Sequence, residues 1–206
     1  RTFGALPPRP ALGADVLARG AAGPATAQAP LRLAHGGDSD QAAAVIAWPT
    51  GGGASRLVES RKLDLLARLF ANRLMDQLRE RAGAAYSPFV TSNWPLDTSS
   101  GGSMFALVQV QPALVPVFFE EAEAIARDLA ANGPTADELA RVVEPVKQFI
   151  NRAQTGHTFW LSQLDGAAFD PQRASALRSL WRDYADATPE EIREVAKRYL
   201  LVDGAL

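Results

Sequence analysis

The stretch that decides the fold reads Leu-Arg-Glu-Arg-Ala-Gly-Ala-Ala-Tyr-Ser and occupies residues 78–87. An apolar-periodic segment typical of a helix runs into it, and a strand-like segment leaves it. Arg79 falls in the last turn of the predicted helix, where the negative end of the helix dipole favours a cation. Gly83 stands where a left-handed cap would end that helix. The sequence therefore predicts a helix that stops near residue 83 and is followed at once by a strand.

Arg79 and Tyr86 are the candidate functional residues of this stretch. If the helix ends near Gly83, both side chains can point into one concavity beside the sheet. A guanidinium offers five donors in a fixed fork, and a phenol can donate to a carbonyl oxygen that gains negative charge, so together they suit a peptide clamp. The alternative is structural, with Arg79 capping helix carbonyls and Tyr86 packed in the sheet. Spacing alone favours this structural alternative.

The remaining elements predict an α+β domain, in which helices gather on one face of an antiparallel sheet. Apolar patterning predicts a hairpin of strands at 31–35 and 41–48, a helix at 55–81, and strands at 84–94 and 102–111. Four helical segments follow, at 114–131, at 135–154, from 156, and at 188–200, two of them opened by the capping boxes Thr135/Glu138 and Thr188/Glu191. Proline-rich residues 1–30 are interpreted as a linker and the tail of a preceding domain. Residues 31–206 are expected to form one domain, truncated as a final strand begins at 202–206.

The wording Leu-Arg-Glu-x-x-Gly-x-x-Tyr-Ser resembles a motif of the pitrilysin and insulysin zinc metallopeptidases, in their C-terminal half, which lacks the zinc site. The segment at 156–164 also resembles a helix start of these domains, and the resemblance extends over about residues 31–200. It implies an antiparallel sheet backed by long helices. It also implies that Arg79 and Tyr86 bind the substrate backbone, with Tyr86 as a possible oxyanion-stabilising donor. Zinc would belong to a partner half, on the same chain or a separate subunit.

Composition excludes several classes of function. The net charge is −2 and the arginines are scattered, so the nucleic-acid binders, including a ferredoxin-like RNA binder, are poor candidates. Cysteine is absent, which fits cytoplasm and periplasm alike. No apolar run reaches the roughly 20 residues that span a bilayer. Because the chain opens at Arg1 without Met, we interpret it as part of a longer protein.

A zinc site needs three or more protein ligands, and the chain has two histidines, His35 and His157, neither of them in an H-x-x-E-H arrangement or its reverse. His157 is interpreted as an exposed residue near a helix start, with a contact to substrate as the alternative. The carboxylates at 120, 121 and 123 are interpreted as a solvated helix face, with a site as the alternative. The glycine run at 51–53 lacks the Gly-Lys-Ser/Thr ending of a phosphate loop and is expected to be a flexible loop.

Two functions remain after these exclusions. The first is a non-catalytic, substrate-binding C-terminal domain of a zinc metallopeptidase that hydrolyses peptides or proteins. Its partners would be a peptide substrate and the zinc-bearing half, and the domain alone would bind no cofactor and show no activity. The alternative is a structural or assembly subunit of the same fold. Retention of both Arg79 and Tyr86 favours the first, since a scaffold does not need a peptide clamp.

Overall fold

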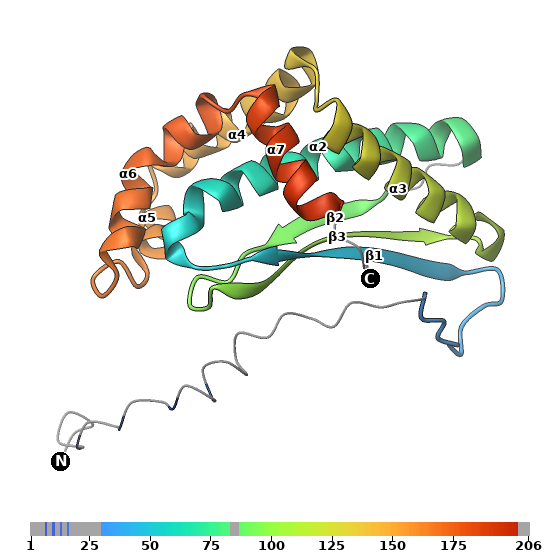
Figure 1. Ribbon diagram of the computed structural model, residues 1–206, viewed down its shortest axis with the longest axis horizontal. Coiled ribbons are helices and arrows are strands. Elements are labelled where there is room, and N and C mark those ends of the chain that lie inside the picture. Colours follow the sequence, from blue (N-terminus) through green and yellow to red (C-terminus); the bar gives the residue numbers. More distant parts are fainter. Residues whose placement is uncertain are drawn as a thin grey trace.

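The computed structural model describes residues 30–82 and 87–201, together with the isolated positions Pro7, Pro10, Gly13 and Val16. Within this part of the chain, a three-stranded antiparallel sheet lies beneath a layer of helices (Figure 1). Its strands are β1 (Ala42–Gly51), β2 (Phe89–Asn93) and β3 (Ser100–Val110), in the spatial order β1-β3-β2. The predicted α+β layout is therefore confirmed, with β3 at the centre of the sheet.

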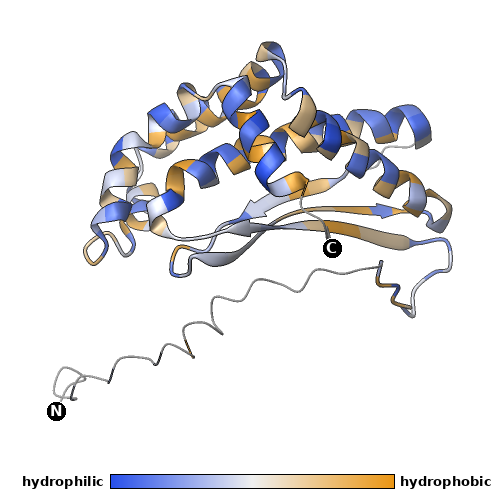
Figure 2. Ribbon diagram, viewed as in Figure 1, coloured by the Kyte–Doolittle hydropathy of each residue, from blue (hydrophilic) through white to orange (hydrophobic). Residues whose placement is uncertain are grey.

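Alternation along the strands divides the sheet into a buried and an open face. The side chains of the buried face are at most 4% exposed: Ala44, Ile46, Trp48, Met104, Ala106, Val108 and Val110. Trp48 packs edge-on against Phe70 of the helix above, with 5.2 Å between the ring centroids. The intervening residues point the other way, and Figure 1 shows the helices on one side of the sheet. Figure 2 shows apolar colour along parts of the strands as well as on the helices.

The helix α2 (Leu57–Ala82) forms the middle of the helical layer, and a 3-10 turn, η2 (Ala54–Arg56), leads into it. Its predicted apolar stripe is confirmed, because every member is at most 1% exposed: Leu63, Leu66, Phe70, Leu74 and Leu78. Fully burying a side chain of this kind contributes roughly 1.5–3 kcal/mol. This stripe places α2 in the hydrophobic core above the sheet.

Glycines close the corner where β1 passes into α2. A Cβ on Gly52 would lie 2.3 Å from the carbonyl oxygen of Thr98, and one on Gly102 would lie 2.2 Å from that of Gly51. The Gly53 N–H donates to the Pro95 carbonyl at 2.8 Å. The glycine run therefore packs against the turn that follows β2. The expected loop is also shorter than predicted, because residues 50 and 51 belong to β1.

The next two helices follow the sequence prediction closely. In α3 (Val115–Ala131) the four residues predicted to share one face are all buried: Phe118, Ala122, Ile125 and Leu129. Gly133 ends the α3 segment with φ of 72°, a conformation that suits glycine. The predicted capping box of α4 (Ala136–Ala153) is present, with the Thr135 side chain accepting from the Glu138 N–H.

In the described residues, five α-helices follow the sheet instead of the predicted four. The additional helix is α6 (Pro171–Ala185), which lies between α5 (His157–Leu164) and α7 (Pro189–Leu200). None of its residues is fully buried. Its start nevertheless carries ordinary signals, since Asp170 accepts a hydrogen bond from the Gln172 N–H at 2.9 Å and Pro171 takes the first helical position. The predicted capping box of α7 is present.

The predicted hairpin at the start of the domain is wrong. Residues 31–35 form no strand, and Leu31 and Leu33 are each 80% exposed. The short apolar run buries nothing, so alternation alone was not sufficient to make a strand. β2 begins at Phe89, later than predicted, and residues 83–86 and 202–206 lie outside the described part of the chain, as does most of 1–30. Among the helices that the structure describes, none has the length and apolar character needed to cross a membrane.

Candidate functional site

Arg79 lies in the last turn of α2, next to Leu78, whose burial anchors this end of the helix in the core. The Arg79 side chain is exposed. Within residues 30–82 and 87–201, no side chain forms an ion pair with it and no helix carbonyl accepts a hydrogen bond from it. Its predicted partner, Tyr86, belongs to residues 83–86 and so lies outside the described residues. The Arg79 guanidinium of the predicted clamp therefore lies at an accessible end of α2.

Arg81, two positions further along, has a different role. Its Nε lies 2.8 Å from Oε1 of Glu121 in α3, as an ion pair, and the Glu121 side chain is 7% exposed. Glu120 and Glu123 are exposed, so the predicted solvated face is correct for them and wrong for Glu121. Two residues advance about 200° around a helix. Arg79 therefore points away from α3 while Arg81 ties the helix end to it.

The strand that follows this helix end forms one edge of the sheet. β2 pairs with β3 from Phe89↔Leu107 to Asn93↔Ser103, and no other described strand pairs with it. An unpaired strand edge offers a row of backbone donors and acceptors to an extended peptide. Nine residues, 80–88, separate the accessible Arg79 from the start of this open edge at Phe89.

An apolar strip on the open face of the sheet starts at the same edge. Phe89 is 56% exposed and its ring lies 5.9 Å from that of Phe105 in the central strand. Leu107 pairs with Phe89 on one side and with Val45, which is 45% exposed, on the other. The strip therefore crosses the three strands and is a candidate contact surface for a polypeptide.

The two histidines do not form a metal site with other described residues. His35 lies in an exposed turn, where its Nδ1 accepts from the Gly37 N–H and its Nε2 is 3.0 Å from the Gln41 carbonyl oxygen. His157 is the exposed first residue of α5. In the part of the chain that the structure describes, no three His, Cys, Asp or Glu side chains converge as metal ligands would.

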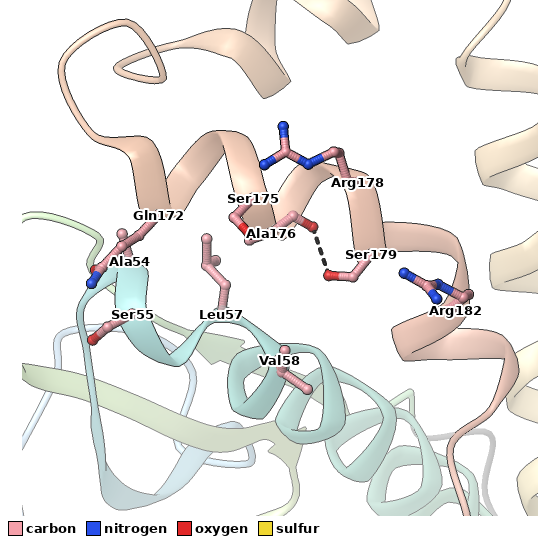
Figure 3. Close-up of a pocket in the computed structure, with 10 residues that line it drawn as sticks. All are labelled: Ala54, Ser55, Leu57, Val58, Gln172, Ser175, Ala176, Arg178, Ser179 and Arg182. Carbon is pink, nitrogen blue, oxygen red and sulfur yellow. Dashed lines mark hydrogen bonds between the residues drawn. The ribbon is translucent and has the colours of Figure 1, made fainter.

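A groove of about 430 Å³ lies at the opposite end of α2, against α6 (Figure 3). One wall is formed by Ala54 and Ser55 of η2 with Leu57 and Val58 of α2, and the α6 wall includes Arg178 and Arg182. The sequence prediction missed this site because it missed α6. The signals that could have found it are the Asp-Pro start of that helix and two arginines four residues apart.

Buried polar contacts hold α6 against α2 beneath this groove. Arg61 forms an ion pair with Asp183, and both side chains are largely buried, at 8% and 11% exposed. Ser179 Oγ donates to the Asp183 carboxylate at 2.9 Å. On the same side of α2, the Tyr184 hydroxyl lies 3.3 Å from Asp64 Oδ2, and burial raises the pKa of Tyr184. These contacts fix the distance between the two walls of the groove.

A polar network also ties the beginning of α2 to α7. Glu59 accepts hydrogen bonds from Arg56 at 2.8 Å and from the Tyr199 hydroxyl at 2.8 Å. Burial by itself raises the pKa of Glu59, but hydrogen bonds from Tyr199, Arg56 and Arg198 outweigh burial and lower that pKa. Arg56 also lies over the ring of Trp94, 5.3 Å from its centroid. Arg56, which lies just before α2, therefore makes its polar contacts within the fold.

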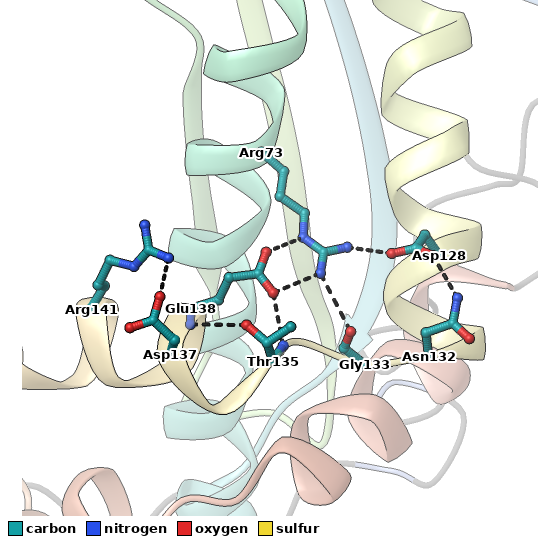
Figure 4. Close-up of polar contacts among 8 residues, drawn as sticks. All are labelled: Arg73, Asp128, Asn132, Gly133, Thr135, Asp137, Glu138 and Arg141. Carbon is teal, nitrogen blue, oxygen red and sulfur yellow. Dashed lines mark hydrogen bonds and ion pairs between the residues drawn. The ribbon is translucent and has the colours of Figure 1, made fainter.

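The middle of α2 is joined to the turn between α3 and α4 by Arg73 (Figure 4). Its guanidinium binds both carboxylate oxygens of Glu138, at 2.8 and 3.0 Å, and Oδ2 of Asp128 at 2.6 Å. The hydrogen bonds from Arg73 are the largest cause of a Glu138 pKa lowered to about 2. This arginine is structural, in contrast to Arg79 at the exposed end of the same helix.

Comparison with known proteins identifies the family to which this architecture belongs. The sequence model of the family described as Peptidase M16 inactive domain matches residues 1–146. The chain belongs to this family. The resemblance to the non-zinc, C-terminal half of pitrilysin-type proteases is thereby confirmed. A search of proteins with curated functions found no match.

Solved structures share the M16 fold at low sequence identity. The peptidase M16 inactive domain from Pseudomonas fluorescens has a TM-score of 0.64 and 18% identity, and the match covers 81% of this chain and 40% of that one. The inactive peptidase domain from Bordetella parapertussis has the same TM-score and identity, over 86% and 94% of the two chains. The ferredoxin protease FusC, solved as a mutant in complex with Arabidopsis ferredoxin, has a TM-score of 0.63 and 15% identity, over 81% and 18%. This M16 domain therefore spans less than half of two of these relatives.

Proposed function

We propose that this M16 inactive domain binds the peptide substrate of a zinc peptidase whose metal and catalytic base belong to another half. The observation that carries the proposal is Arg79, an exposed cation without a carboxylate partner among the described residues, within the motif that resembles one of pitrilysin-type enzymes. Most other cations of the fold are paired, as Arg73 and Arg81 are. An unpaired guanidinium in that motif is available for a peptide backbone. Residues 1–30 would connect residues 31–206 to the preceding domain.

Each residue of the clamp has a distinct chemical role in this proposal. The Arg79 guanidinium donates to a substrate carbonyl and holds the chain in register. The Tyr86 hydroxyl donates to the carbonyl oxygen that becomes an oxyanion during cleavage. When bound in the partner half, zinc supplies an activated water. The open edge of β2 would supply backbone hydrogen bonds to a substrate that lies extended beside it.

The complex of FusC with ferredoxin supports the proposal by analogy. That protease contains this fold over 18% of its length and was captured with a protein bound. The apolar strip from Phe89 to Val45 is a second feature that a polypeptide substrate could contact, because it is exposed on the face that carries no helices. We infer that the substrate class is peptides or proteins.

The test measures peptide hydrolysis by the enzyme that contains both halves. Tyr86→Phe is expected to lower kcat by about 10²- to 10³-fold, the usual effect of removing one oxyanion donor. Arg79→Gln is expected to lower kcat/KM, while Arg152→Gln, an exposed arginine of α4 without a carboxylate partner among the described residues, serves as the control. Thermal melting should be unchanged in all three variants. Cleavage by Tyr86→Phe at the wild-type rate would refute the role assigned to the phenol.

The alternative, a structural subunit without peptidase activity, is favoured by one feature, the apolar strip on the open face of the sheet. A strip of this kind suits an assembly contact as well as a substrate. The two functions differ in their dependence on Arg79. If the isolated domain binds an extended peptide and Arg79→Gln abolishes that binding, the structural function is rejected. If the sequence that precedes the domain has no H-x-x-E-H motif and peptide binding is absent, the structural function replaces the first.

A further inference from the structure

The groove between α2 and α6 differs from the rest of the surface in its charge. Thirteen Lys and Arg side chains in the described residues form ion pairs. The arginines without such a partner among those residues are Arg32, Arg79, Arg152, Arg178 and Arg182. Two of these five, Arg178 and Arg182, line the same groove (Figure 3). None of the described residues that line that groove is acidic. Its positive charge is therefore not neutralised by its own walls.

We propose that this groove binds an acidic, extended segment of a partner polypeptide through Arg178 and Arg182. The charge of its walls decides the chemistry of the occupant, since guanidinium groups bind carboxylates by charge-assisted hydrogen bonds. Leu57 and Val58, the latter 43% exposed, form an apolar floor on the α2 side. The hydroxyls of Ser55 and Ser175 add neutral donors and acceptors along the wall. Such a mixture of apolar floor and polar rim fits a peptide backbone with its side chains.

The arrangement of the arginines favours a polypeptide over one small anion. Figure 3 shows the two guanidinium groups at separate places along α6, not turned toward a single point. Four residues of helix rise by about 6 Å. In an extended peptide, residues i and i+2 point to the same side and lie roughly 6.5 Å apart. A segment with two acidic residues separated by one other residue therefore matches Arg178 and Arg182 in register.

This groove is a different site from the one proposed around Arg79. The 22 residues of α2 between positions 57 and 79 correspond to about 33 Å of helix, so the two sites lie at opposite ends of α2. The family match ends at residue 146, and α6 lies beyond it. The buried Arg61–Asp183 ion pair keeps the groove walls in place without using Arg178 or Arg182. Both arginines are thus available for a ligand and dispensable for the fold.

The experiment measures fluorescence anisotropy of a labelled peptide that contains Leu-Glu-Thr-Glu-Leu, added to the 206-residue chain. Arg178→Gln with Arg182→Gln is expected to weaken binding about tenfold, since each exposed charge pair contributes a few-fold to affinity. Arg152→Gln removes an equally unpaired arginine of α4 and should leave binding unchanged. Circular dichroism and the melting temperature of each variant confirm that it is folded.

Variation of the probe tests the register. A peptide with Leu-Gln-Thr-Gln-Leu should bind as weakly to the wild type as the acidic peptide binds to the double variant. A peptide with adjacent acidic residues, Leu-Glu-Glu-Thr-Leu, should bind more weakly than the spaced one. Equal binding of the acidic peptide to wild type and double variant would overturn the proposal. So would an equal loss in Arg152→Gln, which indicates a net-charge effect, or displacement by an equal concentration of inorganic phosphate, which indicates a small-anion site.

Discussion

Replacing Arg73 by methionine removes the centre of the polar network that joins α2 to the turn between α3 and α4 (Figure 4). The methionine retains an apolar side chain, so the change mainly removes charge and hydrogen bonds. In the wild type the Arg73 side chain is 20% exposed and binds Glu138, which is 27% exposed, through two hydrogen bonds. It also binds Asp128. The variant leaves both carboxylates without their guanidinium.

The size of the effect follows from the pKa of Glu138, which falls from 4.5 to about 2 in the folded chain. The hydrogen bonds from Arg73 are the largest cause, burial opposes them, and bonds from Thr135 add to the lowering. At about 1.4 kcal/mol per pKa unit, the charged Glu138 stabilises the fold by at most about 3 kcal/mol. Part of this comes from Thr135 and remains in the variant, and solvent weakens the rest. We therefore expect Arg73→Met to lower the free energy of unfolding by about 2 kcal/mol at pH 7.

The effect should depend on pH in one direction. The folded pKa of Glu138 lies below the unfolded value, so its contribution is complete above about pH 5 and is lost as the pH falls from 4.5 to about 2. In Arg73→Met the folded pKa returns toward the unfolded one, and this contribution is small at every pH. The stability difference between wild type and variant should thus shrink on acidification, to less than about half by pH 3.

Urea unfolding followed by circular dichroism at pH 7, 4 and 3 measures this difference, and thermal melting at pH 7 should show a decrease of roughly 4–8 °C. Arg141→Met is the matched control, because Arg141 pairs with Asp137 in the first turn of α4 and both side chains are more than two-thirds exposed. The free energy of unfolding of Arg141→Met should fall by no more than about 0.5 kcal/mol. The reasoning fails if the two variants are equally stable at pH 7, or if the deficit of Arg73→Met is the same at pH 3.

Three further substitutions test other parts of the fold. Phe70→Ala should lower the urea-derived free energy of unfolding by about 3–5 kcal/mol, because this ring is fully buried against Trp48. Thr188→Ala removes the capping box of α7 and should cost about 1 kcal/mol, seen as a lower melting temperature. Arg81→Met leaves the buried Glu121 unpaired, so its urea midpoint at pH 7 should fall below that of Arg127→Met, whose partner is exposed. Equal midpoints would show that the Arg81 ion pair contributes no more than the exposed Arg127–Glu123 pair.

Local signals in the sequence were sufficient for most of the fold. The α2 stripe is a long repeat of large apolar residues, and the two capping boxes combine side chains three residues apart, so neighbours in sequence determine both. The strand predicted at 31–35 fails because a strand also needs a partner, and Leu31 and Leu33 bury nothing. The sequence prediction missed α6 although its apolar residues recur at helical spacing, at 177, 180, 181 and 184. None of them is fully buried, and its contact with α2 includes the polar pair Arg61–Asp183, whose partners are distant in sequence.

In the candidate site, too, features set by neighbouring residues could be predicted from the sequence, and features set by distant contacts could not. The exposed end of α2 could be predicted, because Arg79 follows the last stripe residue and precedes a glycine cap signal. The separate role of Arg81 could not, since its partner Glu121 lies 40 residues away, between Glu120 and Glu123 in a segment that looks uniformly solvated. Likewise, the unpaired state of Arg178 and Arg182 depends on which carboxylates the other arginines bind. Ion pairs between residues far apart in sequence depend on the tertiary structure, so the spacing of charges along the chain does not predict them.

The central strand has a consequence for how this domain can change over time. In β3 the even-numbered positions from 104 to 110 are buried beneath the helices, and the odd-numbered ones face outward. Selection for folding therefore acts on the even-numbered positions, and selection for contacts with other molecules acts on the odd-numbered positions between them. A scan of polar substitutions along β3 should give a sawtooth of stability with a period of two. Relatives can diversify the outward residues of one strand while its inward residues still specify the same architecture.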